Sequence, residues 1–410
     1  MRVTFLGHAC HLVEVDGLRV LTDPWLVDPI FEGLVEHDVA LGFGPADLPP
    51  IDAIALTHGH LDHLNAPTLA ALPDKSVPVV HPPAGFTELA ENLRRLGYRN
   101  LHERSDWEPF TLGTARIVPT PSIGVMDECA YVVEGRSGRF FDGGDAPQPP
   151  HLIEEIAKRF GPFDCGALSH NAFDMPALLG LPSHKPADHG LEGGARTARI
   201  LGVAAAVAAA SNMRWCGPDG DAITKRVIRR SRASFVEHLQ RHAPGVEALE
   251  LLPGDAWSRE GGLERGVLRG TPAPRAAHDY VHPFLGTGER YCPPGRPSLE
   301  ETFRRDLPAR LAAAGAAALE VARPVCFEIE GEESATWTVD FSRPAAPAAP
   351  GDAGAPFAVR VPCEAWKDLF ERKVPWQVLL SSDRLRVLRF APGAPPDGLN
   401  FVYALQAVFP

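Results

Sequence analysis

Short apolar runs that alternate with polar positions open the chain and predict strands at 2–5, 10–15 and 18–21. Asp16-Gly17, between the second and third runs, is typical of a hairpin turn. Later runs of the same kind predict strands at 77–80, 116–119, 129–133, 138–141 and 163–168. Apolar residues at helical spacing predict helices at 86–96, 151–160, 191–210 and 222–241. This alternation indicates a two-sheet sandwich with outer helices.

The composition of the chain changes after Trp257. Residues 258–297 are rich in Gly, Pro and Arg and have no clear period, which indicates a connecting segment that lies along the first domain. The C-terminal part then predicts helices at 298–318 and 363–371 and strands within 325–341, 357–361 and 382–390. We therefore expect a first domain at 1–257, a connection at 258–297 and a smaller α+β domain at 298–410. This last domain resembles a sterol-carrier-type domain.

Length and charge limit the classes of protein to consider. A chain of 410 residues is long for one domain and natural for two. Hydrophobic residues make up 45% and charged residues 22%, as in ordinary globular proteins. The net charge of −12 argues against a general nucleic-acid or anionic-membrane surface, because such surfaces need concentrated positive charge. We expect neither nucleic acid nor membrane as a partner.

The cysteines favour a reducing compartment. Seven are present, widely spaced and without a Cys-x-x-Cys pair, so reduced thiols are the simplest interpretation. The N-terminal residues read as a strand rather than a signal peptide. The alanine-rich segment near 200–210 is too short to cross a bilayer. These features predict a cytoplasmic protein.

A histidine-rich motif, Thr-His-Gly-His-Leu-Asp-His at 57–63, directly follows an apolar run at 51–56. The run predicts a buried strand that ends in a loop carrying three histidines and one carboxylate. Imidazole nitrogen and carboxylate oxygen are ligands of zinc and iron. The spacing suits two adjacent metals, with His58 and His60 facing one and Asp62 and His63 facing the other. The alternative is a solvated, histidine-rich turn.

The motif, and the order of elements from residue 1 to about 257, resemble the metallo-β-lactamase superfamily. The resemblance implies a four-layer αββα sandwich, with the metals at the rim between the two sheets. It makes 1–257 the catalytic domain. Most members of the superfamily are hydrolases, and a minority bind two irons and handle dioxygen or redox chemistry.

The resemblance also implies roles for residues outside the motif. In the run Phe-Phe-Asp-Gly-Gly-Asp at 140–145, Asp145 would bridge the two metals, while Asp142 would be structural. Asp23, in an Asp-Pro motif, would orient a ligand histidine from behind, because such carboxylates select the imidazole tautomer. His8 would stand behind the ligands or contact substrate as a catalytic residue, and a surface histidine is the alternative.

Two loops depart from the hydrolase pattern. Hydrolases commonly place a histidine in the loop before the hairpin strand, but 120–128 contains none and instead carries Asp127 and Glu128. They usually place another after the last core strand, and 214–221 has none either. Replacement of imidazole by carboxylate makes a site more anionic and favours iron over zinc. Asp127 is therefore a catalytic candidate.

His170, at the end of the strand predicted at 163–168, could restore one missing histidine. It would ligate the second metal or transfer protons. Glu128 and Asp219 are weaker candidates for the site.

With these two departures, the chain resembles the metallo-β-lactamase-type part of CMP-N-acetylneuraminate hydroxylase. The residues that carry this resemblance are 23–26, Asp62-His63-Leu64, 67–69, 126–129, Asp145 and 376–385. That family carries a Rieske iron–sulfur domain, and this sequence has no paired Cys-x-His and Cys-x-x-His segments. Sialic-acid hydroxylation is therefore not carried over, and dioxygen chemistry would need electrons from a separate donor.

These observations lead to two functional hypotheses, and the intact histidine loop and Asp145 argue against a third, a binding or scaffold protein with a degenerate site. The favoured one is a di-iron, dioxygen-dependent oxygenase or hydroxylase acting on a small polar metabolite. The alternative is a metal-dependent hydrolase of an ester, lactone, amide or phosphodiester that uses a metal-bridging hydroxide. Both need two metal ions, with iron favoured and zinc or manganese as alternatives. The expected partners are a small-molecule substrate and a separate electron donor. The C-terminal domain would cover one side of the pocket or contact a second copy of the chain, and the other option is a tunnel for an apolar ligand.

A basic stretch at 225–232 is the other candidate for chemistry. At helical spacing, Arg226, Arg229 and Arg230 would share one face. One interpretation is a solvated helix face. The other is a clamp for a phosphate or carboxylate, which arginine binds bidentately.

Overall fold

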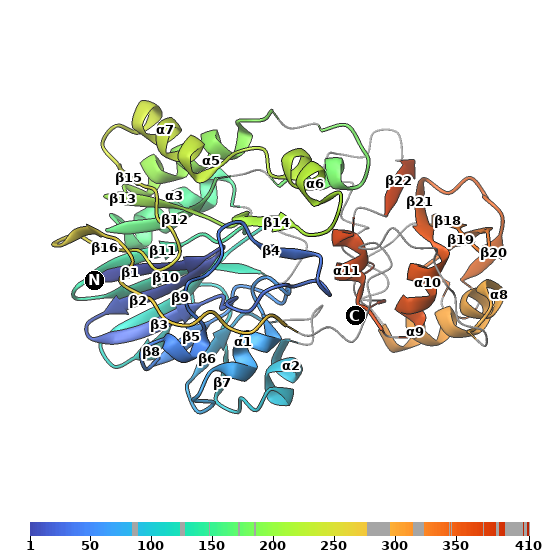
Figure 1. The fold of residues 1–410 in the computed structure, drawn as a ribbon, viewed down its shortest axis with the longest axis horizontal. Helices are drawn as coiled ribbons and strands as arrows, with labels where there is room; N and C mark the ends of the chain where they lie inside the picture. Colours follow the sequence, from blue (N-terminus) through green and yellow to red (C-terminus); the bar gives the residue numbers. More distant parts are fainter. Residues whose placement is uncertain are drawn as a thin grey trace.

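The protein is described here by a computed structural model. It covers residues 1–83, 89–123, 128–146, 148–170, 173–183, 186–276, 296–314, 324–343, 345, 347–371, 373–382, 385–389, 405, 408 and 409. Figure 1 shows a larger N-terminal lobe built on two sheets and a smaller C-terminal lobe, drawn in orange and red.

The first sheet of the larger lobe has eight strands, which run from an antiparallel edge to a parallel edge. In spatial order they are β17 (Gly262–Glu264), β16 (Ala256–Ser258), β1 (Arg2–Gly7), β2 (Cys10–Val15), β3 (Leu18–Thr22), β5 (Ala53–Ala55), β6 (Val79–His81) and β7 (Leu101–Glu103). Asp16 and Gly17, the predicted hairpin turn, have φ of 52° and 82° and join β2 to β3. Positive φ at both positions matches the right-handed twist of a hairpin. The predicted hairpin is confirmed.

The second sheet has seven strands. They are β15 (Glu247–Leu249), β13 (Ala205–Ala209), β12 (Cys165–Ser169), β11 (Gly138–Asp142), β10 (Cys129–Gly135), β9 (Ala115–Pro121) and β8 (Phe110–Leu112). The predicted hairpin of β10 and β11 pairs antiparallel, with Gly135 opposite Gly138. β11, β12, β13 and β15 then pair in parallel, so the carboxyl ends of these four strands meet at one rim.

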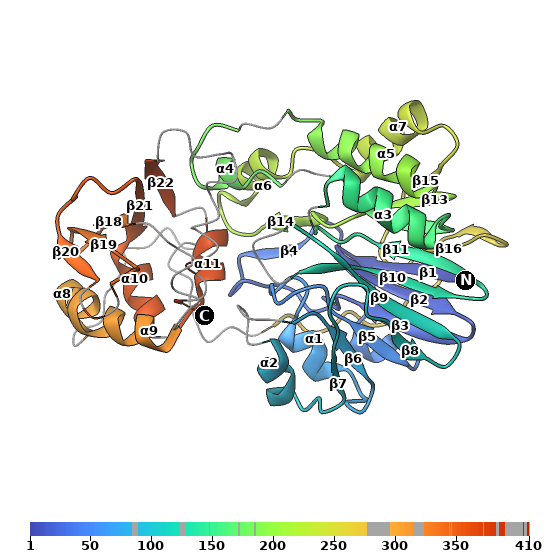
Figure 2. The same cartoon turned by 180° about the vertical axis from the view of Figure 1, so that it is seen from behind.

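Apolar side chains from both sheets form one buried core between them. Its members include Val3, Phe5, Val13, Ile117, Val133 and Phe140. Helices α1 (Ala66–Ala71) and α2 (Leu89–Arg95) pack on the outer face of the first sheet. Helices α3 (Pro150–Phe160), α5 (His189–Leu201) and α7 (Arg232–His242) pack on the outer face of the second, as Figures 1 and 2 show. The four layers are therefore helices, sheet, sheet and helices, which is the αββα sandwich that was predicted.

The predicted helix at 191–210 is wrong in its second half. α5 ends at Leu201, and Gly202 adopts the left-handed conformation (φ 64°) that terminates helices without a Cβ penalty. The alanines that follow form β13, which pairs in parallel with β12 and β15 and is fully buried. Alanine favours helices in isolation, but here the strand partners on both sides decide the structure.

The predicted helix at 222–241 is also wrong, because it is two helices. α6 (Gly220–Val227) ends where Ile228 becomes extended. α7 then begins after Ser231, whose side chain accepts a hydrogen bond from the Ser234 amide. Arg226 lies in the last turn of α6, and Arg229 and Arg230 lie in the link between the helices. The three arginines therefore do not share one helix face.

The segment after Trp257 lies along the larger lobe where it is described. It contributes β17 to the first sheet, and the Gly270 amide donates to the Gly42 carbonyl at 3.0 Å. Further on, Arg275 forms an ion pair with Glu36 at 2.8 Å. The contacts agree with the predicted position of this segment.

The smaller lobe contains a five-stranded sheet in the order β20 (Ala348–Pro350), β19 (Ala335–Val339), β18 (Val325–Glu330), β21 (Phe357–Pro362) and β22 (Arg386–Arg389). Its helices are α8 (Leu299–Glu301), α9 (Leu307–Ala314), α10 (Cys363–Phe370) and α11 (Trp376–Ser381), and a π-helical turn at Thr302–Asp306 joins the first two. The lobe is thus α+β, and its sterol-carrier likeness stays a prediction.

The two lobes share an apolar cluster and several hydrogen bonds. Trp25 and Trp215 of the larger lobe belong to the same buried cluster as Trp366 and Trp376 of the smaller one. The Trp215 Nε1 atom donates to the Ser381 carbonyl at 2.8 Å. None of the helices in the described part of the chain combines the length and the apolar character that a membrane crossing needs.

Candidate metal centre

The histidine loop begins where β5 ends, at the rim of the first sheet. The amides of His63 and Leu64 both donate to the His60 carbonyl, at 3.0 and 2.7 Å, so the loop closes into a compact turn. Asn65 then caps α1 by accepting a hydrogen bond from the Thr68 amide. This turn brings the side chains of the motif back toward the sheets instead of into solvent.

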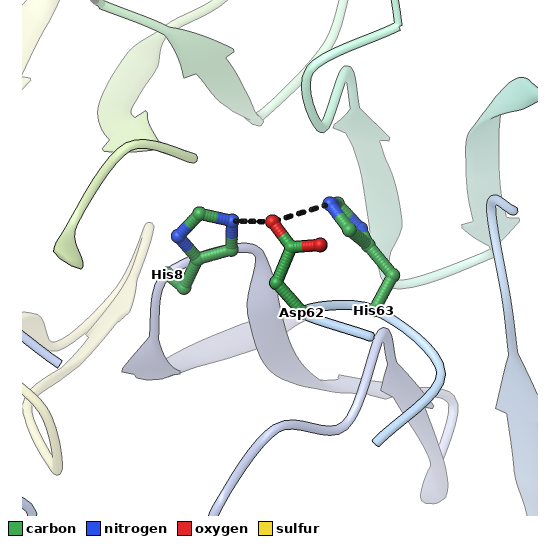
Figure 3. A group of neighbouring side chains, drawn as sticks. All are labelled: His8, Asp62 and His63. Carbon is green, nitrogen blue, oxygen red and sulfur yellow. Dashed lines mark ion pairs between the residues drawn. The ribbon is translucent and has the colours of Figure 1, made fainter. Parts of the chain in front are cut away.

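Three buried side chains converge at the first position suited to a cation: His8, Asp62 and His63 (Figure 3). The Oδ2 atom of Asp62 lies 3.3 Å from His8 Nε2 and 3.8 Å from His63 Nε2. His8 follows β1 with a positive φ of 49°, a conformation rare for residues other than glycine. Sequence reasoning gave His8 a place behind the ligands or at the substrate, and the structure puts its ring beside two expected ligands.

A second group combines His58, His63 and Asp145. The Nε2 atom of His63 lies 3.5 Å from Asp145 Oδ1, and His58 Nε2 lies 2.7 Å from His60 Nδ1. All three histidines of the motif therefore meet at this rim. We expected Asp62 and His63 on one metal and His58 and His60 on the other. In the structure His63 belongs to both groups, and His60 contacts His58 but belongs to neither.

Asp145 reaches the histidines through the glycine turn that follows β11. The Gly143 amide donates to the Ala167 carbonyl at 2.9 Å, and a Cβ at Gly143 would lie 3.0 Å from that oxygen. Gly144 adopts a positive φ of 49°. The two glycines therefore permit the close approach that brings Asp145 to His63.

Asp23 holds the histidine loop from behind. Its Oδ2 atom accepts hydrogen bonds from His63 Nδ1 at 2.7 Å and from Thr57 Oγ1 at 2.7 Å. Its Oδ1 atom accepts one from the Thr57 amide at 2.8 Å. This is the contact that the sequence predicted for Asp23, and it leaves His63 Nε2 directed at the carboxylates of the two groups.

The electrostatics of the site favour a cation. Burial alone would lower the pKa of His63, but the charges of Asp145, Asp23 and Asp62 hold it well above the ordinary value. Burial, together with the neighbouring His63 and His60, keeps the pKa of His58 well below its ordinary value. A neutral imidazole is the form that binds metals. The carboxylates around His63 therefore favour a positive charge at this position, and the neutral imidazole of His58 lies next to it.

The residues present fit a pair of divalent cations. His63 Nε2 is buried and makes no hydrogen bond within the described part of the chain. Both ring nitrogens of His8 are likewise buried and without a hydrogen bond there. A buried polar atom without a hydrogen bond is costly unless something else satisfies it. Cations held by imidazole nitrogens and carboxylate oxygens would do so with the ligands that iron and zinc prefer.

Glu128, ranked low on the sequence, lies near this site. Its Oε1 atom accepts a hydrogen bond from Ser122 Oγ at 3.0 Å. Burial and the Asp145 carboxylate raise the pKa of Glu128 to about 8. Its preferred neighbour Asp127 lies outside the described residues. Of the two carboxylates in the loop at 120–128, Glu128 is the one among the described residues.

Two further candidates, His170 and Asp219, also lie outside both groups, as does Asp142. His170 is buried and its Nδ1 atom lies 3.2 Å from the Ala209 carbonyl. Asp219 is exposed at the start of α6. Asp142, expected to be structural, accepts a hydrogen bond from the Gly144 amide at 3.3 Å and lies 3.5 Å from His11 Nδ1. Among the described residues, then, His170 joins neither cluster, and its role as ligand stays a prediction.

Comparison with known families agrees with the fold and the motif. Residues 19–209 match the family described as the Beta-lactamase superfamily domain. This range contains the histidine loop, Asp23 and Asp145. The matched region, just under half of the chain, is similar to this superfamily, in agreement with the αββα sandwich and the histidine motif.

Proteins with different activities are similar to parts of this chain. A 4-amino-L-phenylalanyl-[CmlP-peptidyl-carrier-protein] 3-hydroxylase of Streptomyces venezuelae is 28% identical over 39% of this chain and 32% of its own length. A cytidine monophosphate-N-acetylneuraminic acid hydroxylase of Asterias rubens is 28% identical over 32% of this chain and 21% of its own length. The structure of an isothiocyanate hydrolase from Delia radicum gut bacteria has a TM-score of 0.48 and 20% identity, covering 63% of this chain and 99% of that one. The chain spans about a third of the length of the first curated relatives that it matches.

Proposed function

We propose that the chain is a binuclear-metal oxygenase that binds two irons and uses dioxygen to hydroxylate or oxidise a small polar metabolite. The observation that carries the proposal is the donor set. Glu128 lies in the loop where hydrolases of this fold commonly carry a histidine. The negative charge of Asp145 raises the pKa of Glu128, so the two carboxyl groups are close enough to interact. Such a carboxylate-rich set favours iron over zinc.

The relatives give independent support. Two hydroxylases match the chain at 28% identity. Their shared region is only a part of each protein, so the proposal takes from them the reaction class and not a substrate. A reduced pair of irons in this site would activate dioxygen, and a separate donor would supply the electrons.

Each residue would have a distinct task. His58, His60, Asp62, His63 and Asp145 would hold the metals. His8, whose Nε2 faces Asp62, would complete the first group, and Asp23 would hold His63 in the tautomer that binds through Nε2. Glu128 would add a carboxylate near Asp145 once a cation lowers its pKa.

Elemental analysis of the protein purified without added metal tests the proposal. We expect about two irons per chain, in line with the two residue groups. An absorption band that bleaches on reduction and returns in air should accompany them. A consumption assay with dioxygen, an electron donor and a panel of polar metabolites would then identify the substrate.

The competing function is hydrolysis, which the histidine motif also supports. Two zincs per chain, no response to reductant and turnover of ester or lactone substrates would contradict the oxygenase. A Glu128→His variant sharpens the comparison, because it restores the common histidine. We expect this variant to shift metal selectivity toward zinc, while Glu154→His on the exposed face of α3 should leave selectivity unchanged.

A further inference from the structure

The segment that follows β13 contacts the candidate metal centre from the second sheet. β13 ends at Ala209, and the residues after it reach the end of β1 in the first sheet. The Ala210 amide donates to the His8 carbonyl at 3.0 Å, and Asn212 Nδ2 donates to the same oxygen at 3.3 Å. A carbonyl oxygen has two lone pairs, so both are used. The His8 peptide group is therefore fixed by contacts from the opposite sheet.

The backbone around the candidate metal centre has an unusual conformation. Positive φ occurs at four residues other than glycine, namely His8 (49°), Asp23 (38°), Ala210 (56°) and Ser211 (56°). Side chains disfavour this region because the Cβ atom comes too close to the following carbonyl oxygen. Such residues persist only where the surrounding contacts hold them, and they cluster at functional sites. The contacts that hold His8 therefore bear on the function of the site.

Asn212 is buried and connects three segments of the chain. Its Nδ2 atom donates to the Ala208 carbonyl at 3.3 Å as well as to His8, so the two amide hydrogens join the end of β13 to the end of β1. Its backbone carbonyl accepts a hydrogen bond from the Asp38 amide at 3.3 Å. Asp38 directly follows β4 (Val35–His37). The side chain of Asn212 is thus fixed between partners that belong to both sheets.

The His8 ring depends on this backbone for its position. Its Nε2 atom lies 3.3 Å from Asp62 Oδ2 (Figure 3), and its ring centroid lies 5.2 Å from that of Trp25 and 5.5 Å from that of His63. A strand continued through His8 would need a negative φ. The left-handed conformation ends β1 here, so the place of the imidazole follows from the contacts that hold this conformation.

We propose that Asn212 is a positioning residue for His8. Its side-chain amide holds the His8 carbonyl and so keeps the imidazole where it can bind a divalent metal together with Asp62 and His63. Asn212 is in neither of the metal groups found among the described residues, so it acts through His8. The inference rests on the metal centre proposed above, but not on which metal it holds or which reaction it performs.

Titration of the full chain with Co²⁺, after removal of metal by a chelator, tests the proposal, because the visible spectrum of bound Co²⁺ responds to its ligands. We expect Asn212→Ala to bind one Co²⁺ roughly tenfold or more weakly, with an altered spectrum, because contacts behind a ligand tune metal affinity. His8→Ala should show the same loss. Asn100→Ala is the matched control, because Asn100 Nδ2 donates to the Ser76 carbonyl at 3.0 Å outside both groups. This control should bind Co²⁺ like the wild type.

A glycine at position 211 gives a readout that a packing role of Asn212 would not change. Glycine adopts positive φ without a Cβ penalty. Ser211→Gly should therefore lower the cost of the turn and restore part of the Co²⁺ affinity that Asn212→Ala loses. Equal affinity in Asn212→Ala and in the double variant would overturn the positioning role.

Hydrogen exchange in the wild type tests the same coupling without any variant. Coupling between two sites is reciprocal, so bound Co²⁺ should slow exchange of the Ala210 amide, which donates to His8. The Glu247 amide donates to the Ala204 carbonyl at 2.8 Å, before the start of β13, and reports on the stability of the fold as a whole. It should slow less. Equal slowing at both amides would overturn the proposal.

The outcomes separate this proposal from the proposed oxygenase. If His8→Ala loses Co²⁺ affinity and Asn212→Ala keeps it, the positioning role alone is overturned. If both variants bind Co²⁺ as tightly as the wild type, His8 is not a ligand, and its place in the first group is overturned as well. Two zincs per chain in the protein as purified would contradict the oxygenase, while weaker Co²⁺ binding by Asn212→Ala would still support the positioning role.

Discussion

The Nδ1 atom of His63 lies 2.7 Å from the Asp23 carboxylate, and its Nε2 atom lies 3.5 Å from the Asp145 carboxylate. One imidazole thus connects a fully buried carboxylate to a partly exposed one at the rim. The first contact selects which ring nitrogen faces the candidate metals, and it also ties the histidine loop to the end of β3.

Replacement of Asp23 by Asn should weaken metal binding without removing a ligand. The side-chain oxygen of the introduced asparagine can still accept a hydrogen bond from Thr57. The variant loses the negative charge that makes His63 Nε2 a stronger metal ligand, so we expect a metal affinity roughly 10- to 100-fold lower. Competition with a chromophoric chelator measures this. Asp28→Asn is the matched control, because Asp28 pairs with His37 Nδ1 at 3.0 Å outside both groups. Equal affinity in the two variants would contradict the supporting role of Asp23.

Gln377 of α11 should stabilise the histidine loop from the smaller lobe. Its Oε1 atom accepts a hydrogen bond from the Leu61 amide at 3.3 Å, inside the motif. Gln377→Ala leaves that partly buried amide without its partner, which costs about 1 kcal/mol. We expect faster hydrogen exchange at Leu61 and quicker metal loss to a chelator. Gln148→Ala, which removes contacts to Thr120 and Pro121 only, should change neither.

His170 should make the folded state less stable in mild acid. Burial lowers its pKa from 6.5 to about 4. Well above pH 6.5 the ring is neutral in both states, but as the pH falls toward 4 the unfolded chain binds the proton more readily than the folded one. This imidazole alone then reduces the free energy of unfolding by about 3 kcal/mol at the lower limit.

Urea unfolding of wild type and His170→Gln across this pH range measures the effect. The variant cannot titrate, so its free energy of unfolding should fall less steeply with pH than that of wild type. The exposed His151→Gln serves as control and should follow the wild type. Parallel curves for wild type and His170→Gln would show that the ring is charged in the folded state or that the site relaxes around it.

Arg296 should be the ion-pairing residue on which the smaller lobe depends most. Only 8% of its side chain is exposed, and it contacts Asp368 at 2.6 Å and Glu371 at 2.7 Å. Arg296→Ala would leave the buried Asp368 with one cation fewer and cost about 3–5 kcal/mol. Arg305→Ala, which breaks exposed pairs with Glu301 and Asp306, should cost far less. Thermal unfolding of both variants compares them, and equal losses would contradict the argument.

The sequence by itself determined the parts of the site that lie close together along the chain. The strand–loop arrangement, the motif at 57–63 and the glycine turn before Asp145 depend on local periodicity and on residues that permit special backbone conformations. The hairpin at Asp16-Gly17 and most strands follow from the same local signals. These features need no knowledge of distant neighbours.

Only the tertiary structure decided the features that depend on strand pairing and lobe docking. The alanines at Ala205–Ala209 became a strand because β12 and β15 flank them, against their helical preference. His8 met Asp62 because the end of β1 and the loop after β5 share one rim. Arg386 reached the Leu178 carbonyl because β22 docks on the end of α4 (Met175–Leu178). Contacts of this kind join residues far apart in the chain, so no local pattern encodes them.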